Sequence, residues 1–125
     1  MSDFPKAAGT CPTQDGHGRW VVGSDGGIFT AGSAQYYGSL PGLKVVVSNI
    51  IGIERSWGGA GYYLYGSDGG VFAFGDAVER GSYPGLPAAE RQGDRAFGAG
   101  SFRLHWGGAG YDLLALDGST YSFGS

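Results

Sequence analysis

Apolar residues recur at alternate positions in short runs along the chain, which is the pattern of β-strands. The run 71–74, Val-Phe-Ala-Phe, places valine and alanine on one face and two phenylalanines on the other. The run 62–65 similarly places Tyr62 and Leu64 on one face and two further tyrosines on the other. Because both faces of these strands are apolar, we expect sheets packed between neighbouring sheets and not a sheet with one solvated face.

This strand pattern occurs three times. An Asp-Gly step lies between two apolar runs at Asp25, Asp68 and Asp117, so the repeat spacing is 43 and then 49 residues. The repeat units are about 5–43, 48–86 and 94–125, and together they form a single domain of residues 1–125. The six extra residues of the second spacing lie between Leu86 and Trp106, in a polar stretch that predicts an exposed loop.

Each unit is expected to contain up to four short antiparallel strands. In the middle unit these are about 49–57, 62–67, 71–75 and 78–82. Asp-Gly between β runs predicts type I′ hairpin turns, in which both central residues have positive φ. The sequence ends at Ser125, before a fourth strand of the last unit, so we expect about eleven strands and one unpaired edge.

The predicted fold is all-β, with the three units as propeller-like blades. Propeller rings typically have 4–8 blades, so three blades would form half of a six-bladed ring that is closed by oligomerisation. The alternative is a pseudo-threefold β-trefoil or β-prism, which would be a closed monomer. The two predictions therefore differ in oligomeric state.

Composition supports short strands joined by tight turns. The chain of 125 residues has 27 glycines but only 5 prolines, and it has no Gly-X-Y period, which excludes collagen. Aromatic residues make up 14% and charged residues 15% of the chain, the opposite of a disordered tract. Helices should be scarce, because an interior glycine costs about 1 kcal/mol relative to alanine.

Charge and terminal sequence bear on partners and location. The net charge of −3 argues against nucleic acid as a partner, and neither a polybasic segment nor a long apolar run suggests a membrane. The first six residues lack the features of a signal peptide. We expect a protein made in the cytoplasm that reaches a virion or a cell surface by non-classical release.

The repeats resemble a known family of Gly/aromatic β-repeats. Residues 61–75, GYYLYGSDGGVFAFG, are similar to the repeat GYWLVxSDGGVFxFGDA of actinobacterial surface proteins and their phages, and the third copy departs from it at Asp112. The resemblance implies propeller repeats akin to those of tectonin and tachylectin, with surface binding, of glycans in particular, and no catalysis. It also suggests an actinobacteriophage virion component, either a capsid decoration or a tail-associated protein.

The residues that could carry catalysis do not form a recognisable constellation. Asp25, Asp68 and Asp117 belong to separate units, too far apart for a pair of catalytic carboxylates, and are expected to have a structural role in their turns. His17 and His105 do not align in the repeats, and the single cysteine, Cys11, is expected to be a small buried hydrophobe. We expect no enzyme activity, no metal and no cofactor.

Aromatic residues are the better candidates for a binding site. Trp57 and Trp106 each precede a Gly-Gly-Ala-Gly turn, where one ring face could stack on a sugar, and Tyr62 and Tyr111 follow those turns. The alternative is that both tryptophans pack between blades. The sequence thus predicts a non-catalytic structural protein that forms a homo-oligomer or joins a larger assembly through the edge of its incomplete last unit. The alternative function is a lectin-like module that recognises cell-envelope glycans.

Overall fold

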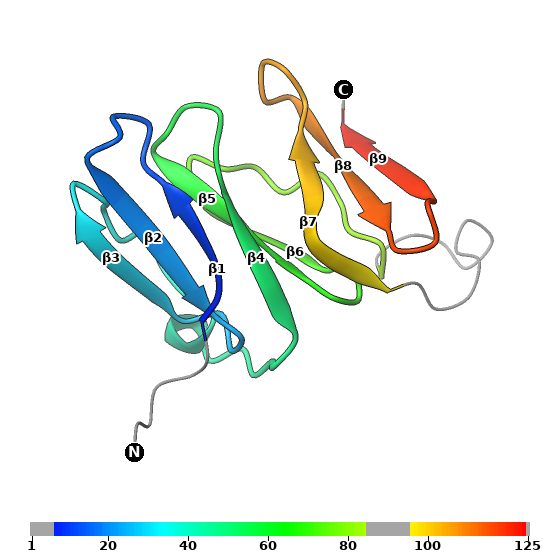
Figure 1. Ribbon diagram of the computed structural model, residues 1–125, viewed down its shortest axis with the longest axis horizontal. Coiled ribbons are helices and arrows are strands. Elements are labelled where there is room, and N and C mark those ends of the chain that lie inside the picture. Colours follow the sequence, from blue (N-terminus) through cyan, green and yellow to red (C-terminus); the bar gives the residue numbers. More distant parts are fainter. Residues whose placement is uncertain (1–6, 85–95, 125) are drawn as a thin grey trace.

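The protein is all-β, with three separate antiparallel sheets of three strands each (Figure 1). The computed structural model describes residues 7–84 and 96–124. The first sheet contains β1 (Ala7–Pro12), β2 (Gly18–Gly23) and β3 (Ile28–Gly32); the second contains β4 (Ile50–Arg55), β5 (Gly61–Gly66) and β6 (Val71–Gly75); the third contains β7 (Phe97–Leu104), β8 (Gly110–Ala115) and β9 (Thr120–Gly124). One short 3₁₀ helix, η1 (Pro41–Leu43), lies between the first two sheets in sequence. Each sheet corresponds to one of the repeat units found in the sequence.

The three sheets lie in a row, with the second sheet packed between the other two (Figure 1). On β5, Tyr62 and Leu64 join a hydrophobic cluster with residues of the first sheet. Tyr63 and Tyr65 point the other way, into a cluster with residues of the third sheet. Every residue of β5 is buried, so the prediction that both faces of this strand pack against neighbouring sheets is confirmed.

The row of sheets is open. β1 packs against β4, and β4 packs against β7. Among the described residues, no contact of similar extent joins the first sheet to the third. The all-β class is thus established, whereas neither a closed ring nor a closed pseudo-threefold barrel is formed within the described part of one chain.

The prediction of a fourth strand in the first and second units is wrong for the described residues. Segments 34–39 and 77–82, which correspond to that strand, are not strands. The described chain has nine strands and not eleven, and the third unit is no shorter in strands than the other two. The edge of the third sheet at β9 is unpaired within the described chain, but so are those at β3 and β6, and the last unit is not distinguished by it.

Glycines at the ends of the third strands explain why the chain leaves each sheet. Gly32, Gly75 and Gly124 have φ values of +60°, +70° and +79°, a left-handed conformation that favours glycine. Each also lies so close to the preceding turn that a Cβ atom would collide with a backbone carbonyl oxygen. The chain turns away at Gly32 and Gly75, and the segments that follow do not pair with β3 or β6.

The connecting segments bind instead to their own sheet at one end and to the next sheet on the way. After β3, the N–H of Leu40 donates to the carbonyl of Gly26 at 3.3 Å; after β6, the N–H of Tyr83 donates to the carbonyl of Gly69 at 3.0 Å. Between these points, each segment passes over a buried tyrosine of the following sheet, as described below. The connections thus join adjacent sheets to one another.

Part of the six-residue insertion is a longer bulge in β7. In β4, Ile50 and Ile53 lie opposite Gly66 and Leu64, whereas Phe97 and Phe102 lie opposite Ala115 and Leu113. Five positions of β7 therefore span the same two partner positions that three positions of β4 span. The remainder of the insertion, expected to be an exposed loop, lies largely outside the described residues.

Candidate binding surface

The turn between the first and second strands carries a tryptophan in the second and third sheets. Trp57 is 48% exposed and Trp106 is 90% exposed. Their ring centroids are 5.4 Å apart at an interplanar angle of 62°, an edge-to-face pair. The two tryptophans that the sequence singles out are therefore brought together at the surface, although Trp106 is covered far less than Trp57.

A groove of about 480 Å³ lies beside Trp57, between the second and third sheets. Its lining combines the indole with charged and polar side chains, among them Glu54, Arg55 and Arg103. Burial raises the pKa of Glu54 above its ordinary value. An aromatic face beside hydrogen-bonding groups of both signs is the chemistry that a polyhydroxylated ligand requires.

A second groove, of about 410 Å³, lies between the first and second sheets beside Trp20 and the segment that follows β3, whereas the groove beside Trp57 lies along β4 and β7. Here Gln14 stands at the repeat position of Trp57. Asp15 and Ser33 also line this groove, and hydrogen bonds from the Thr13 hydroxyl, the His17 N–H and the Ser33 hydroxyl lower the pKa of Asp15 to about 2. The described linings coincide in the repeat at the turn, where Gln14 corresponds to Trp57, whereas most of the other lining residues stand at different repeat positions.

Tyr62 and Tyr111, which the sequence suggests as ligand contacts, are fully buried. The Tyr62 hydroxyl accepts the N–H of Tyr37 at 2.9 Å and donates to the carbonyl of Gly38 at 2.6 Å. The Tyr111 hydroxyl makes the same two bonds, with Arg80 and Gly81. Burial raises the pKa of each phenol to about 12. Both tyrosines hold connecting segments and present no surface to a ligand.

Asp25, Asp68 and Asp117 cap their own turns. Each carboxylate accepts the N–H two residues further along the chain, at 2.8, 2.8 and 2.9 Å respectively. These hydrogen bonds are Asx turns, which stabilise a tight turn locally.

The turn type differs from the predicted type I′. Lys44 is the one non-glycine residue of the described chain with positive φ, so the aspartates do not adopt the left-handed conformation. In the first turn, the N–H of Gly26 donates to Gly23 and Gly23 donates to Gly27, both at 2.9 Å, and Gly26 has a φ of +83°. This is a three-residue loop in which glycine alone takes the left-handed position.

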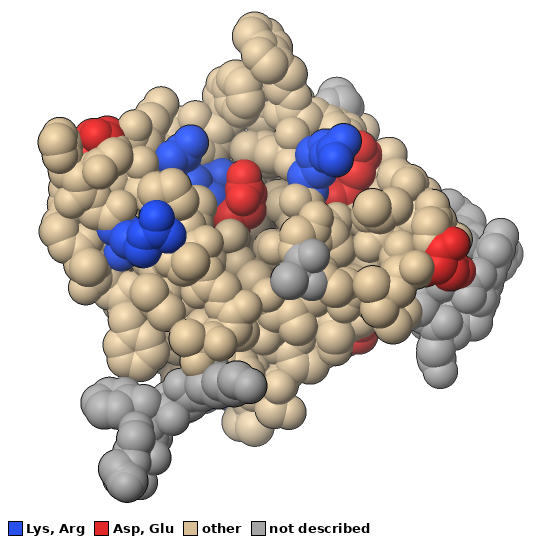
Figure 2. Space-filling view, viewed as in Figure 1, with Lys and Arg blue, Asp and Glu red and all other residues tan. Residues whose placement is uncertain are grey.

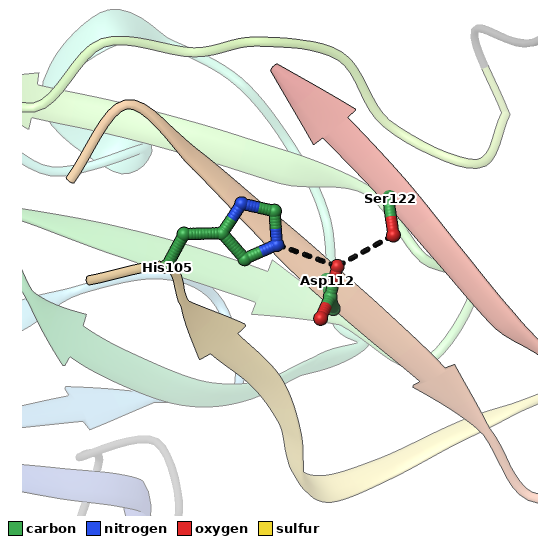
Figure 3. A network of polar contacts seen from close by, with 3 residues as sticks. All are labelled: His105, Asp112 and Ser122. Carbon is green, nitrogen blue, oxygen red and sulfur yellow. Dashed lines mark hydrogen bonds and ion pairs between the residues drawn. The ribbon is translucent and has the colours of Figure 1, made fainter. Parts of the chain in front are cut away.

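His105, Asp112 and Ser122 form a polar network whose residue types are those of a catalytic triad (Figure 3). His105 Nε2 lies 2.7 Å from Asp112 Oδ1, and the Ser122 hydroxyl donates to the same oxygen at 2.6 Å. Figure 3 shows both side chains directed at the carboxylate and not at one another. Nucleophilic catalysis requires the serine to be bonded to the imidazole, so this connectivity is not that of a triad.

The other two sheets contain equivalent networks. Ser56 donates to Asp76 at 2.5 Å, and Thr13 and Ser33 both donate to Asp15. Thr13, Ser56 and His105 occupy one repeat position, but the carboxylate comes from a different position in each unit. Sequence comparison missed the network for that reason. Its recurrence indicates that it fastens the first turn of each sheet to the rest of that sheet.

No cluster that could hold a metal ion is found among the described histidines, cysteines and carboxylates. Cys11 is buried between the first and second sheets, and burial raises the pKa of its thiol. No helix in the described part of the chain is long and apolar enough to cross a membrane. On the face shown in Figure 2, the charged side chains are few, and the two signs are interspersed.

Comparison of the chain with family models, with curated proteins and with solved structures finds no match in any of the three. The fold class and the surface described above are therefore the basis for a functional proposal.

Proposed function

We propose that this protein is a non-catalytic structural and binding protein whose stacked β units assemble with other protein subunits. The observation that carries the proposal is the contrast between β5, which is buried on both faces, and the outward faces of the first and third sheets. The first and third sheets each have one face exposed, whereas the second sheet has a neighbouring sheet on both faces.

The outward face of the first sheet includes Val21 and Phe29, which are paired across β2 and β3. On the third sheet, Leu114 of β8 points outward and is 46% exposed. Each end face thus carries apolar side chains but no further sheet of the described chain packs over it, which supports binding of another protein there.

Within this proposal, the three sheets are blades of an incomplete propeller. Support comes from the sequential order of the stack, in which the first strand of each sheet packs against the first strand of the next. Three blades are too few for a ring, which typically has 4–8. A propeller of this kind would be completed only by assembly.

The experiment is the mass of the native protein by multi-angle light scattering over a range of concentrations. The chain has a mass of 12.9 kDa, and the proposal expects a whole-number multiple of that mass. A particle that keeps the mass of one chain at every concentration would contradict assembly with its own kind. Turnover assays are not expected to detect activity.

For the kind of assembly, we propose the virion of an actinobacteriophage, as capsid decoration or tail-associated protein. The support is the resemblance of residues 61–75 to the repeats of actinobacterial surface proteins and their phages. Mass spectrometry of purified virions tests it: the chain is expected among the structural proteins, and its absence from intact particles would contradict the proposal.

A second candidate function is carbohydrate binding, favoured by the groove beside Trp57. The indole would stack on the apolar face of a sugar, and Glu54 would bond its hydroxyls. A glycan array tests this function: binding is expected for the native chain and loss of binding for Trp57→Ala. Trp57→Phe, which keeps an aromatic face, should retain part of the signal. Binding that survives Trp57→Ala and Trp106→Ala together would exclude this site.

A further inference from the structure

We propose that the partner of the exposed end faces is a second copy of this chain, bound head to tail, with Asp112 of each copy paired to Arg19 of the other. Two copies would then close a ring of six sheets. This inference rests on the proposed assembly function and specifies its interface.

The chain contains two junctions between sheets, the first between sheets one and two and the second between sheets two and three. They define the register that such an interface would have. Across the first junction, Trp20 packs against Tyr62 with ring centroids 5.5 Å apart; across the second, Tyr63 packs against Tyr111 at 5.4 Å. The interplanar angles are 62° and 64°. The repeat places one aromatic pair at the same point of each junction, with nearly the same geometry.

Alignment of the repeats identifies the residues at that point on the two open ends. Asp112 of the third sheet stands at the position of Trp20 and Tyr63, and Arg19 of the first sheet stands at the position of Tyr62 and Tyr111. The strand registers agree, because the partners of Arg19, Tyr62 and Tyr111 on the first strand of each sheet also occupy one repeat position. A third junction of the same geometry would therefore place Asp112 opposite Arg19 of a second copy.

Both side chains can make this pair. The described hydrogen bonds of Asp112, from His105 and Ser122, are to Oδ1, so Oδ2 remains an available acceptor. Hydrogen bonding from Ser122, with the bond and the field of His105, lowers the pKa of Asp112 and keeps it ionised. One guanidinium nitrogen of Arg19 donates to the Thr10 hydroxyl at 2.9 Å, and a guanidinium has five N–H donors.

Arg103 is the nearest other charge on the outward face of the third sheet, since it pairs with Asp112 across β7 and β8. It aligns with Cys11, which packs in the cluster of the first junction together with Ile53 of β4. By the same register, Arg103 would face β1 of the second copy and not Arg19. The opposite charges of Asp112 and Arg19 thus meet without a like charge between them.

The tryptophan turn gives an independent match between the two ends. A Cβ atom added to Gly59 would collide with Gln14 of the preceding sheet, and one added to Gly108 would collide with Trp57. At the corresponding Gly16 a Cβ atom would meet nothing within 4 Å. Trp106, at the position of Gln14 and Trp57, is 90% exposed. A head-to-tail neighbour would place Trp106 over Gly16 of the second copy.

This interface uses different patches on the two partners, so it must either close into a ring or continue as a filament. Two copies supply six sheets, which is within the usual range of about 4–8 for propellers. A ring of two copies has two identical junctions and leaves neither end face exposed. We therefore propose closure with two copies.

The test uses two charge reversals, Arg19→Asp and Asp112→Arg, with native mass measured by light scattering. The native chain should have twice the mass of one chain. Each variant alone places like charges at both junctions and should dissociate at least tenfold more readily. Mixed in equal amounts, the two variants should regain the double mass, because each junction then joins an aspartate to an arginine.

Controls separate this result from a general effect. Lys44→Glu reverses an exposed charge outside both end faces and should leave the mass unchanged. Circular dichroism establishes that each variant is folded. If Asp112→Arg does not fold, Arg19→Asp and Trp106→Ala still test the interface. Each of these two variants should lower the native mass of the assembly.

The outcomes distinguish the interface from the proposed function. An assembled native protein whose mass is unchanged by Arg19→Asp and by Trp106→Ala would overturn this interface but leave the assembly function standing. A native protein with the mass of one chain at all concentrations would overturn both.

Discussion

The two junctions, where the first sheet meets the second and the second meets the third, share an aromatic pair and a set of hydrogen bonds. They differ in the side chains that occupy the rest of the interface. In each, an aromatic residue on one sheet packs against a tyrosine of the next, and the hydroxyl of that tyrosine binds a connecting segment. The first junction is otherwise filled mainly by aliphatic side chains such as Ile53 and Leu64. The second is mainly aromatic, with Tyr65 and Phe102 stacked at 5.5 Å and 13°.

The shared contacts are therefore those that set how two sheets are aligned, and the contacts that differ are those that fill the space between the sheets. Backbone groups fix the tyrosine hydroxyl and the connecting segment, so substitution there changes how two sheets are aligned. Side chains in the remaining space need only conserve volume and apolar character. The following predictions test whether the two junctions respond alike at the shared positions.

The largest effect is expected for the aromatic pair. Trp20→Ala and Tyr63→Ala each remove a buried ring that joins two sheets, and each should lower the free energy of unfolding by about 3–5 kcal/mol. Chemical denaturation at one fixed protein concentration measures both, since assembly would make stability depend on concentration. A loss at one junction only would show that the two pairs are not equivalent.

Sequence alone predicted the units, their first three strands and the two-sided burial of β5. Strand alternation and the repeat spacing carry that information directly, and the predicted 71–75 is the observed β6. The fourth strand was mispredicted because segments 34–39 and 77–82 have the composition of a strand, while the decisive feature is the positive φ of Gly32 and Gly75. A glycine in a chain of many glycines does not reveal which conformation it adopts.

The candidate site was predicted in part. Trp57 and Trp106 were recognised from their place before a turn, but nothing in the sequence shows that they form an edge-to-face pair. Tyr62 and Tyr111 differ from Tyr63 only in which way they point, and their hydroxyl bonds are to segments 24 to 31 residues away. The Asp112 network was missed because its carboxylate has no fixed place in the repeat.

The next effect concerns the connecting segments at Gly38 and Gly81. Their φ values are +129° and +134°, and a Cβ atom would press on the ring of Phe74 or Phe123. Gly38→Ala and Gly81→Ala should each destabilise the fold by about 2–4 kcal/mol, from backbone strain and displacement of the ring.

Gly118→Ala is the matched control for these two variants. Gly118 also has positive φ, +95°, but a Cβ atom there would meet nothing within 4 Å. It should cost only the backbone strain, about 1–2 kcal/mol. Equal losses at all three positions in thermal or chemical denaturation would mean that the contact with the phenylalanine rings contributes nothing.

A smaller effect is expected when the tyrosine hydroxyl alone is removed. Tyr62→Phe and Tyr111→Phe keep the ring but leave a backbone N–H and a carbonyl of the connecting segment without this partner. Each should cost about 1–3 kcal/mol. Unequal losses would indicate that one junction depends less on its connecting segment.

The same tyrosines predict a dependence on pH. Burial raises the pKa of both phenols from the ordinary value near 10 to about 12. Between these values the unfolded chain ionises while the folded chain does not, so the free energy of unfolding should fall as pH rises from about 10 to 12. The double variant Tyr62→Phe, Tyr111→Phe should show a shallower fall in urea titrations. An identical slope would assign the pH dependence to other groups.

The smallest effect is expected at the turn aspartates. Asp25→Ala and Asp68→Ala each remove a hydrogen bond to a glycine N–H at 2.8 Å within a single hairpin. The loss should be about 0.5–1.5 kcal/mol and similar in the first and second sheets. Asp68→Asn retains the accepting oxygen and should restore most of the stability. A loss at Asp25 or Asp68 as large as that at Trp20 would mean that the turns, and not the stacked junctions, hold the sheets in register.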